Sequence, residues 1–327
     1  MKKVLVTGCA GFVGYHLVKQ LLLEGNCEVV GVDDFSRPTN DKEFQKLLTN
    51  PLLTFIEGNL SETKFVETLP SDVDIIFHLA AINGTLNFYQ IPYDVAVSCA
   101  IPTWNLVNRY VNSNLEKFIF AGTPESYASS ILLGIAEIPT KEEVPLSITS
   151  PLDSRWSYAS GKLFSESLVC MAAQQHKFPF LIVRLHNVYG PRMGPHHFIP
   201  DFLNRVKKGV FLLNGGTDTR SFLYIRDAVS DLISLSTLKS ASEMIVNLGS
   251  DDEIQIQKVA NEILLLLGIE ANLEINASPP NSVSRRVPDV SRLNKLLGPR
   301  HRTSLSMGLA HCIKEVFQDY KMENHDV

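Results

Sequence analysis

The chain has 327 residues, of which 45% are hydrophobic, and its formal net charge is −5 at pH 7. A chain of this length and composition can bury a large core, as one large α/β domain or as a large domain with a smaller partner. The slightly acidic charge leaves no basic footprint, so we expect no nucleic-acid partner.

Cysteine usage and hydropathy bear on the compartment. The five cysteines are odd in number and form no CxxC pair, which is typical of reduced thiols in a cytoplasmic protein. The first expected strand begins at Lys3, which leaves no room for a signal peptide, and no apolar run reaches about 18 residues. We therefore expect a cytoplasmic location and no membrane partner.

Short apolar runs alternate with amphipathic segments over the first 185 residues. We expect strands at residues 3–7, 28–32, 53–57, 75–79, 117–121 and 180–185. The expected helices include residues 12–23, 95–110 and 156–173. Continuous apolar strands separated by helices predict a parallel sheet that is covered on both faces. Because crossovers in such sheets are right-handed, the predicted fold is α/β, a doubly wound parallel sheet of the Rossmann type.

Three glycines join the first expected strand to the first expected helix. Gly8, Gly11 and Gly14 form a GxxGxxG pattern, which contains the apolar residues Phe12 and Val13. A tight turn and a close approach of backbone to pyrophosphate both favour residues without Cβ, and the start of a helix attracts phosphate. The pattern predicts a dinucleotide site rather than a simple strand–helix turn.

Asp33 ends the second expected strand, where a carboxylate can accept hydrogen bonds from an adenosine ribose. The same charge repels a 2′-phosphate, so the predicted cofactor is NAD rather than NADP. Arg37 is a basic residue nearby that leaves NADP open as an alternative.

Tyr158 and Lys162 lie four residues apart in the last of these expected helices and therefore share one helix face. An ammonium close to a phenol favours phenolate, so we expect Lys162 to lower the pKa of Tyr158 from about 10 toward the working pH. Such a phenolate can take the proton of a sugar or alcohol hydroxyl while a hydride leaves the same carbon. The spacing also occurs by chance in helices, and the glycine pattern upstream favours the catalytic interpretation.

After residue 185 the alternation gives way to the turns Gly190-Pro191, Asn214-Gly215-Gly216 and Ser278-Pro279-Pro280-Asn281. We predict an NAD-binding domain at residues 1–185. Residues 186–327 are predicted to form a smaller, mixed C-terminal substrate lobe, with some segments returning to the large domain. The active site is expected in the cleft between them, outside the carboxyl ends of the strands.

His196 and His197 are the only residues that suggest a metal. Adjacent histidines on an extended backbone point apart, and no companion motif of carboxylate and histidine accompanies them, so we expect no metal site. They are expected to line the substrate cleft or to begin a helix at about residues 199–206.

The chain also contains His78-Leu79-Ala80-Ala81 and Asn187-Val188-Tyr189-Gly190-Pro191. With the motifs above, these segments make it resemble the extended short-chain dehydrogenase/reductase family, and within it the nucleotide-sugar epimerases, dehydratases and decarboxylases. The resemblance runs from Met1 to about Arg302. It implies an NAD-dependent enzyme for a nucleotide-diphosphate sugar, and a homodimer paired through the helices around residues 95–110 and 156–173.

The resemblance also implies roles for individual residues. Tyr158 is then the acid–base residue, Lys162 holds the nicotinamide ribose, and Thr123 bonds the sugar 4-hydroxyl. Glu125 matches a glutamate of dehydratases and uronic-acid decarboxylases, and is either catalytic or a solvated loop residue. The other implied cofactor-binding positions are Asn59, Leu60, Leu79, Ala80 and Ala81. The other implied substrate-binding positions are Asn83, Asn187, Arg192, Arg220 and Arg286, the last two as partners of the diphosphate.

Pro124 separates the chain from one group of these enzymes. It stands where 4,6-dehydratases have an aspartate that protonates the leaving C6 hydroxyl, and proline has no titratable group. We expect an epimerase that acts by transient oxidation at sugar C4. The alternatives are a decarboxylase of the UDP-glucuronate type, a 4,6-dehydratase, a net C4 dehydrogenase and, from another class, a non-catalytic dinucleotide-binding regulator. The sequence identifies neither the nucleotide base nor the sugar.

Overall fold

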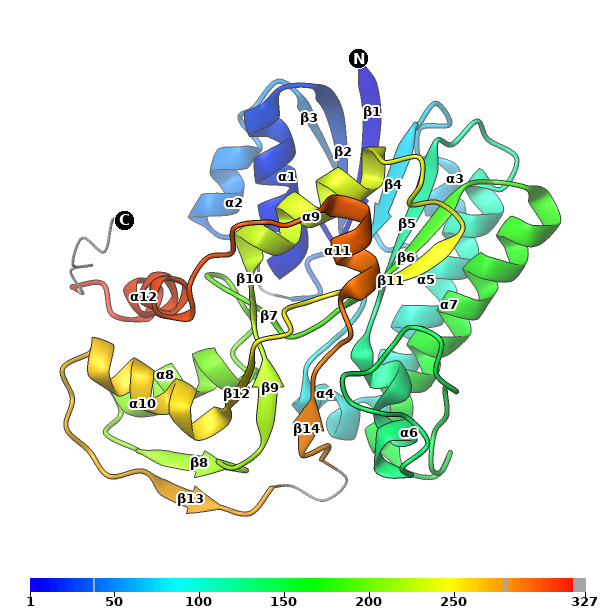
Figure 1. Ribbon diagram of the computed structural model, residues 1–327. Coiled ribbons are helices and arrows are strands. Elements are labelled where there is room, and N and C mark those ends of the chain that lie inside the picture. The colour runs from blue at the N-terminus through cyan, green and yellow to red at the C-terminus, as the bar shows by residue number, and fades with distance from the viewer. Residues whose placement is uncertain (38, 279–281, 320–327) are drawn as a thin grey trace. The chain divides into compact units, whose positions relative to one another are not determined.

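Seven strands form one sheet in the order β11-β6-β5-β4-β1-β2-β3 (Figure 1). The computed structural model describes residues 1–37, 39–278 and 282–319. The strands are β1 (Lys2–Thr7), β2 (Cys27–Asp33), β3 (Leu53–Glu57), β4 (Ile75–His78), β5 (Lys117–Gly122), β6 (Phe180–Leu185) and β11 (Met244–Leu248). Every pairing from β3 through to β6 is parallel, so the predicted doubly wound α/β fold is confirmed.

The chain divides into two compact units. Unit 1 comprises Met1–Ser126, Leu146–Arg184 and Val229–Val246, and unit 2 comprises Tyr127–Pro145, Leu185–Ala228 and Asn247–Val327. The assignment of residues 1–185 to the cofactor and 186–327 to the substrate remains a prediction. Most of the expected turn at residues 278–281, and residues 320–327 of the expected lobe, lie outside the described residues.

Helices follow the strands of unit 1 in the expected alternation. They are α1 (Phe12–Glu24), α2 (Lys42–Leu47), α3 (Thr63–Glu67), α4 (Thr85–Gln90), α5 (Pro92–Tyr110) and α7 (Ser157–His176), while α9 (Ile225–Thr237) runs across the boundary between the units. Helices α5 and α7 pack side by side (Figure 1). Pro92 opens α5 at a position where its missing N–H costs no helical hydrogen bond. Helix α7 begins one residue later than expected, because Trp156 closes the 3₁₀ turn η2 (Ser154–Trp156).

The core of unit 1 lies between the sheet and the α5–α7 pair. Phe118 and Phe120 of β5 are buried there with Ile182 of β6, and Leu106 of α5 and Val169 of α7 cover them. All six residues of β5 are buried, as expected for a central parallel strand that is covered on both faces. This packing fixes the carboxyl end of β5, from which the turn η1 (Pro124–Tyr127) continues.

Unit 2 is built from short elements. Its helices are α6 (Ala128–Leu132), α8 (Phe198–Lys207), α10 (Ile256–Leu266), α11 (Ser291–Leu297) and α12 (Leu305–Val316). Its strands pair as β10 (Leu223–Tyr224) with β7 (Val188–Tyr189), β13 (Glu274–Asn276) with β8 (Leu212–Asn214), and both β12 (Glu253–Gln255) and β14 (Arg285–Arg286) with β9 (Thr219–Ser221).

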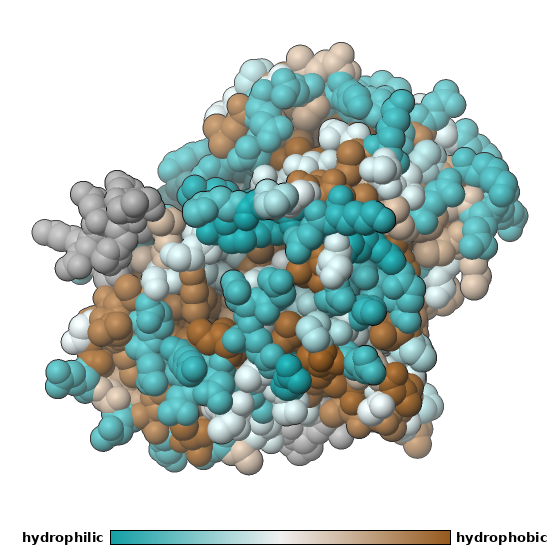
Figure 2. Space-filling view, in the orientation of Figure 1, coloured by the Kyte–Doolittle hydropathy of each residue, from teal (hydrophilic) through white to brown (hydrophobic). Residues whose placement is uncertain are grey.

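Hydrophilic and hydrophobic residues are interspersed over the face seen in Figure 2. Within the described ranges, no helix combines the length and the apolar character that crossing a membrane requires.

Candidate functional site

The glycine loop between β1 and α1 is closed too tightly for side chains. A Cβ on Gly14 would lie 2.0 Å from the carbonyl oxygen of Gly8, and Gly8 itself has a φ of +70°. A Cβ on Gly8 would lie 2.9 Å from the backbone of Ala80. In the described part of the chain, no side chain caps the first turn of α1, so this helix start presents its dipole and N–H groups to an anion. The loop therefore fits a dinucleotide pyrophosphate.

Asp33 holds this loop from the end of β2. One carboxylate oxygen accepts a hydrogen bond from the Ala10 amide at 3.0 Å, and the other accepts one from the Phe35 amide at 2.9 Å. Burial raises the pKa of the Asp33 carboxyl, and the backbone donors oppose that shift. Each oxygen has a second lone pair, so these bonds leave acceptors for a ribose diol.

The predicted segment after β4 lies against the same loop. Thr7 of β1 accepts hydrogen bonds from the amides of Leu79 and Ala80 at 3.2 and 3.3 Å. The Thr7 hydroxyl also bonds Nδ1 of His78 at 2.8 Å. Burial, with a smaller effect of the Lys162 charge, lowers the pKa of His78 to about 3, so this imidazole is neutral at physiological pH.

Asn59, Leu60 and Asn83 lie in turns after β3 and β4. The Asn59 side chain accepts a hydrogen bond from the Ser61 amide at 2.8 Å, and Leu60 is buried. The Asn83 side chain accepts one from the Gly84 amide at 2.7 Å, just before α4. These residues shape the turns, and their predicted contacts with adenine and substrate remain predictions.

Thr123 and Tyr158 are hydrogen-bonded to each other. Thr123 follows the carboxyl end of β5, and Tyr158 lies in the first turn of α7; both side chains are buried. The ammonium of Lys162 lies 5.9 Å from the centre of the Tyr158 ring and donates to the Ala121 carbonyl at 2.9 Å. The structure thus brings together the three residues that the sequence predicted for proton transfer.

The expected lowering of the Tyr158 pKa by Lys162 is wrong in this structure. Burial raises the pKa of the Tyr158 phenol well above its ordinary value, the charges of Cys99 and Glu125 raise it further, and the Thr123 bond lowers it. The cause is an apolar enclosure, because Phe88, Val95 and Cys99 form one buried cluster with Tyr158. Phe88 stacks on the phenol ring with centroids 5.2 Å apart.

Glu125 lies in the turn that begins at Thr123, whose hydroxyl accepts a hydrogen bond from the Glu125 amide at 3.3 Å. The carboxylate accepts a hydrogen bond from the Arg155 guanidinium at 2.5 Å. The two side chains are only 14% and 9% exposed. The alternative that Glu125 is a solvated loop residue is therefore wrong.

Arg155 was not among the predicted site residues. Its guanidinium lies 5.1 Å from the Trp156 ring and 5.9 Å from the Phe88 ring, so it joins Glu125 to the aromatic wall beside Tyr158. The segment Arg155-Trp156-Ser157-Tyr158, which resembles that of uronic-acid decarboxylases, is a sequence feature that points to it.

Within unit 2, two predicted substrate arginines are neighbours. Arg286 of β14 pairs in register with Arg220 of β9, although the two residues lie 66 positions apart in the chain.

The other residues of unit 2 that were predicted to line the site lie elsewhere in its loops. Asn187 has a positive φ of 39°, and the Arg192 amide donates to both oxygens of Glu315. His197 directly precedes α8, in agreement with the expected helix start. Among the described residues, no group of three or more His, Cys, Asp or Glu side chains is arranged to hold a metal.

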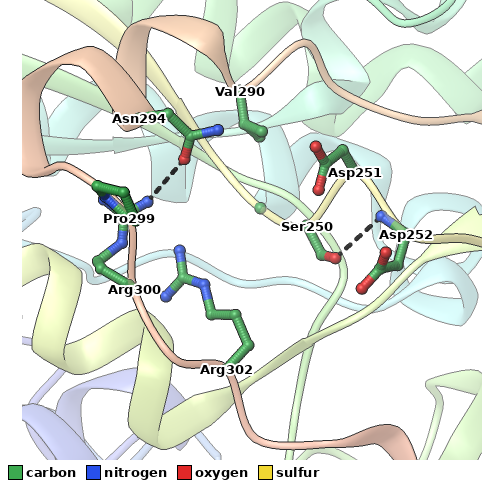
Figure 3. Close-up of a pocket in the computed structure, with 9 residues that line it drawn as sticks. Ser250, Asp251, Asp252, Val290, Asn294, Pro299, Arg300 and Arg302 are labelled. Atoms are coloured by element: carbon green, nitrogen blue, oxygen red, sulfur yellow. Dashed lines mark hydrogen bonds between the residues drawn. The ribbon is translucent and has the colours of Figure 1, made fainter.

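A further pocket of unit 2 has a volume of about 360 Å³ (Figure 3). Arg300 donates to the Asn294 side chain at 3.1 Å, and Arg302 extends beside Arg300. Ser250 and Asp252 lie across from them. None of the predicted site residues lines this pocket.

Three comparisons place the chain among known proteins. The model of the NAD dependent epimerase/dehydratase family matches residues 4–249. The chain is 31% identical to an uncharacterized UDP-glucose epimerase, YtcB, of Bacillus subtilis (strain 168), over 98% of this chain and 100% of that protein. It is also 31% identical to a UDP-N-acetyl-alpha-D-glucosaminuronate decarboxylase of Bacillus cytotoxicus, over 96% and 97% of the two chains.

One solved structure is similar to this chain over nearly its whole length. The UDP-glucuronic acid 4-epimerase of Bacillus cereus, crystallised with UDP-glucuronic acid and NAD, superposes with a TM-score of 0.87 at 27% identity, over 97% of this chain and 100% of that one.

Proposed function

Because the chain belongs to the NAD dependent epimerase/dehydratase family, we propose that it is an NAD-dependent epimerase that inverts C4 of a nucleotide-diphosphate sugar by transient oxidation. The hydrogen bond between Thr123 and Tyr158 is the main support for this proposal, because it sets a proton-transfer pair at the carboxyl end of the interior strand β5. The same pair shares unit 1 with the glycine loop.

NAD is the cofactor, as in the solved relatives that contain it. We propose that Gly8, Gly11 and Gly14, with Phe12 and Val13 at the start of α1, hold its pyrophosphate. Asp33 would accept hydrogen bonds from the adenosine ribose, and Lys162 would donate to the nicotinamide ribose. Asn59, Leu60, Leu79, Ala80 and Ala81 would line the remainder of the cofactor site. When bound, NAD would supply a hydride acceptor and then a hydride donor for C4, with a positive charge while it is oxidised.

The proton of the sugar 4-hydroxyl would pass to Tyr158. Thr123 orients that hydroxyl and favours phenolate through its bond to the phenol. Lys162, held by the Ala121 carbonyl, keeps a cation close to the Tyr158 ring. After the 4-keto sugar has rotated in the site to present its other face, the same phenol returns the proton. The buried site keeps water from competing for it.

The substrate's diphosphate would be bound by Arg220 and Arg286. Because Arg220 and Arg286 pair in register on adjacent strands, their two guanidinium groups are suited to bind one diphosphate together. Asn83, Asn187 and Arg192 are proposed to complete the substrate contacts. Pro124 provides no acid for loss of the C6 hydroxyl, which disfavours a 4,6-dehydratase.

A second candidate is the decarboxylation of a nucleotide-linked uronic acid. The enclosed Glu125 carboxylate beside Tyr158 favours it, together with the 31% identical decarboxylase relative. A 4-keto uronic acid is a β-keto acid and loses CO2 readily, so both candidates share the first oxidation step.

We further propose a homodimer in the cytoplasm. The five cysteines are unpaired thiols, which fits a reducing compartment. Ile101 and Trp104 are exposed on α5, and Phe164 and Met171 are exposed on α7, at spacings that give each helix an apolar stripe. Stripes on two adjacent helices suit a four-helix bundle with a second copy.

Proton NMR of the products tests the function. A panel of UDP-, GDP- and dTDP-sugars, beginning with UDP-glucose and UDP-glucuronic acid, is incubated with wild type and with Tyr158→Phe. We expect a C4 epimer from wild type and a rate on the order of 10² to 10⁴ lower from the variant. CO2 release from UDP-glucuronic acid, abolished by Glu125→Gln, would replace the epimerase with the decarboxylase. Equal activity of wild type and variant would contradict both.

A further inference from the structure

We infer that Arg155 is a positioning residue that confines the chemistry to C4, by holding Glu125 in an ion pair and so preventing it from acting as a base at the neighbouring carbons. This inference rests on the proposed function. Arg155 acts through Glu125 and takes no part itself in proton or hydride transfer. Its ion pair explains why a carboxylate is tolerated beside the Tyr158 phenol.

The arrangement of the turn after β5 places Glu125 where it can act as an unwanted base. Thr123 bonds both the phenol of Tyr158 and the amide of Glu125, so the Glu125 carboxylate belongs to the same turn as the group that binds the 4-hydroxyl. Oxidation at C4 leaves a ketone, and a ketone acidifies the C–H bonds on both of its neighbours, C3 and C5. A carboxylate at this place is a candidate base for either proton.

Proton abstraction by Glu125 needs no further reagent. The C–H bond at C3 or C5 breaks, its electron pair moves into the C4 carbonyl to give an enolate, and the proton passes to a Glu125 oxygen. The Thr123 and Tyr158 hydroxyls, which are proposed to bind the C4 oxygen, would stabilise the enolate oxygen. If the carboxyl proton of Glu125 exchanges with solvent before it returns to carbon, the ketone is restored with a solvent proton in place of the original one. A return to the other face would scramble a second stereocentre.

Arg155 removes this base by geometry and charge. Its guanidinium contacts the carboxylate at 2.5 Å, and both side chains are largely enclosed. A guanidinium favours the ionised carboxylate and directs its lone pairs into the ion pair, so the bound carboxylate is a poor proton acceptor. The guanidinium also lies over the Trp156 and Phe88 rings, and these cation–π contacts help to hold it where it faces Glu125.

Deuterium incorporation tests the inference. Wild type, Arg155→Met, Arg155→Lys and the double variant Arg155→Met/Glu125→Gln are incubated in D2O with UDP-glucose and, in parallel, with UDP-glucuronic acid. Arg205→Met, which breaks an ion pair on α8, is the matched control. We expect C4 epimers without deuterium at C3 or C5 from wild type and control. Arg155→Met should incorporate at least about tenfold more deuterium per turnover, Arg155→Lys an intermediate amount, and the double variant no more than wild type.

The outcomes separate the inference from the function on which it rests. Epimer formation by Arg155→Met without deuterium overturns the inference and leaves the function standing, as does deuterium that persists in the double variant. Deuterium at C5 with CO2 release from UDP-glucuronic acid by wild type overturns the epimerase and the inference together. So does a wild type that epimerises none of the UDP-, GDP- and dTDP-sugars of the panel. If Arg155→Met fails to fold, Arg155→Lys with and without Glu125→Gln provides the same comparison.

Discussion

Tyr158 has to lose a proton although its surroundings favour the neutral phenol. Burial raises its pKa, and the Glu125 charge acts in the same direction, whereas the Thr123 hydrogen bond lowers it. The phenol is therefore tuned by opposing contacts, and removing one of them should shift the pH at which the enzyme becomes active.

Thr123→Val should move the acidic limb of the pH profile of kcat/KM to higher pH. The lost hydrogen bond favours the phenolate, so its loss raises the phenol pKa, and a higher pH is then needed to form the base. Thr123→Ser keeps the hydroxyl and is the control, with a limb close to that of wild type. A limb that stays in place in Thr123→Val, or moves to lower pH, would show that this bond does not tune Tyr158.

Asp33 should decide which dinucleotide the protein keeps through purification. We expect the supernatant of heat-denatured protein to contain NAD(H) and no NADP(H), because the cofactor is regenerated in each cycle and a carboxylate repels a 2′-phosphate. Asp33→Ala loses both this selection and the two hydrogen bonds to the loop backbone, so its dinucleotide content should fall. Asp34→Ala, which loses a bond to the Ser36 amide, is the neighbouring control and should retain the cofactor. Chromatography of the supernatants would contradict us by finding NADP, or equal NAD in both variants.

Among the elements, the glycine loop has the least room for change. A side chain on Gly14 would meet the Gly8 carbonyl at 2.0 Å and the Cys9 Cα at 2.9 Å, and backbone atoms cannot turn away. Gly14→Ala should therefore reduce the free energy of unfolding by about 1–3 kcal/mol and weaken NAD binding. Gly11→Ala meets one carbonyl at 3.1 Å and should be milder in urea unfolding of the apoprotein. An equal loss in both variants would mean that the loop relaxes at either position.

Elements whose pattern is local were predictable from the sequence. The strands at residues 53–57 and 180–185 have the expected bounds. Strands β1, β4 and β5 differ from expectation by one residue at one end, and β2 by one residue at each end. Continuous apolar runs determine β4, β5 and β6 most clearly, because nearly every residue of these three strands is buried. The edge strand β11 was not predicted, since a five-residue strand that pairs with β6 from far along the chain has no periodicity that identifies its partner.

The site residues likewise divide into those with a local sequence pattern, which were predicted, and those that depend on long-range contacts, which were not. Tyr158 and Lys162 were found because four residues make one helical turn, and Gly8, Gly11 and Gly14 because a tight loop selects against Cβ. Long-range contacts were missed, namely the ion pair from Glu125 to Arg155 and the register of Arg220 with Arg286. The sign of the Tyr158 pKa shift was wrong for a related reason. It depends on the apolar wall formed by α4 and α5, whereas the local sequence shows only the Lys162 charge on the same helix as Tyr158.

For the whole molecule, the exposed aromatic residues on α5 and α7 predict the oligomeric state. Trp104 is 50% exposed and Phe164 is 53% exposed, which is costly in water for side chains of this size. We expect light scattering at micromolar concentration to give about twice the chain mass of 36.4 kDa. Trp104→Glu combined with Phe164→Glu should yield the single-chain mass, because two charges per copy would be buried without partners in the bundle. Leu265→Glu, at a 74% exposed position on α10, is the control and should remain a dimer. A wild type of single-chain mass would reject the dimer, and a double variant of dimer mass would move the interface away from α5 and α7.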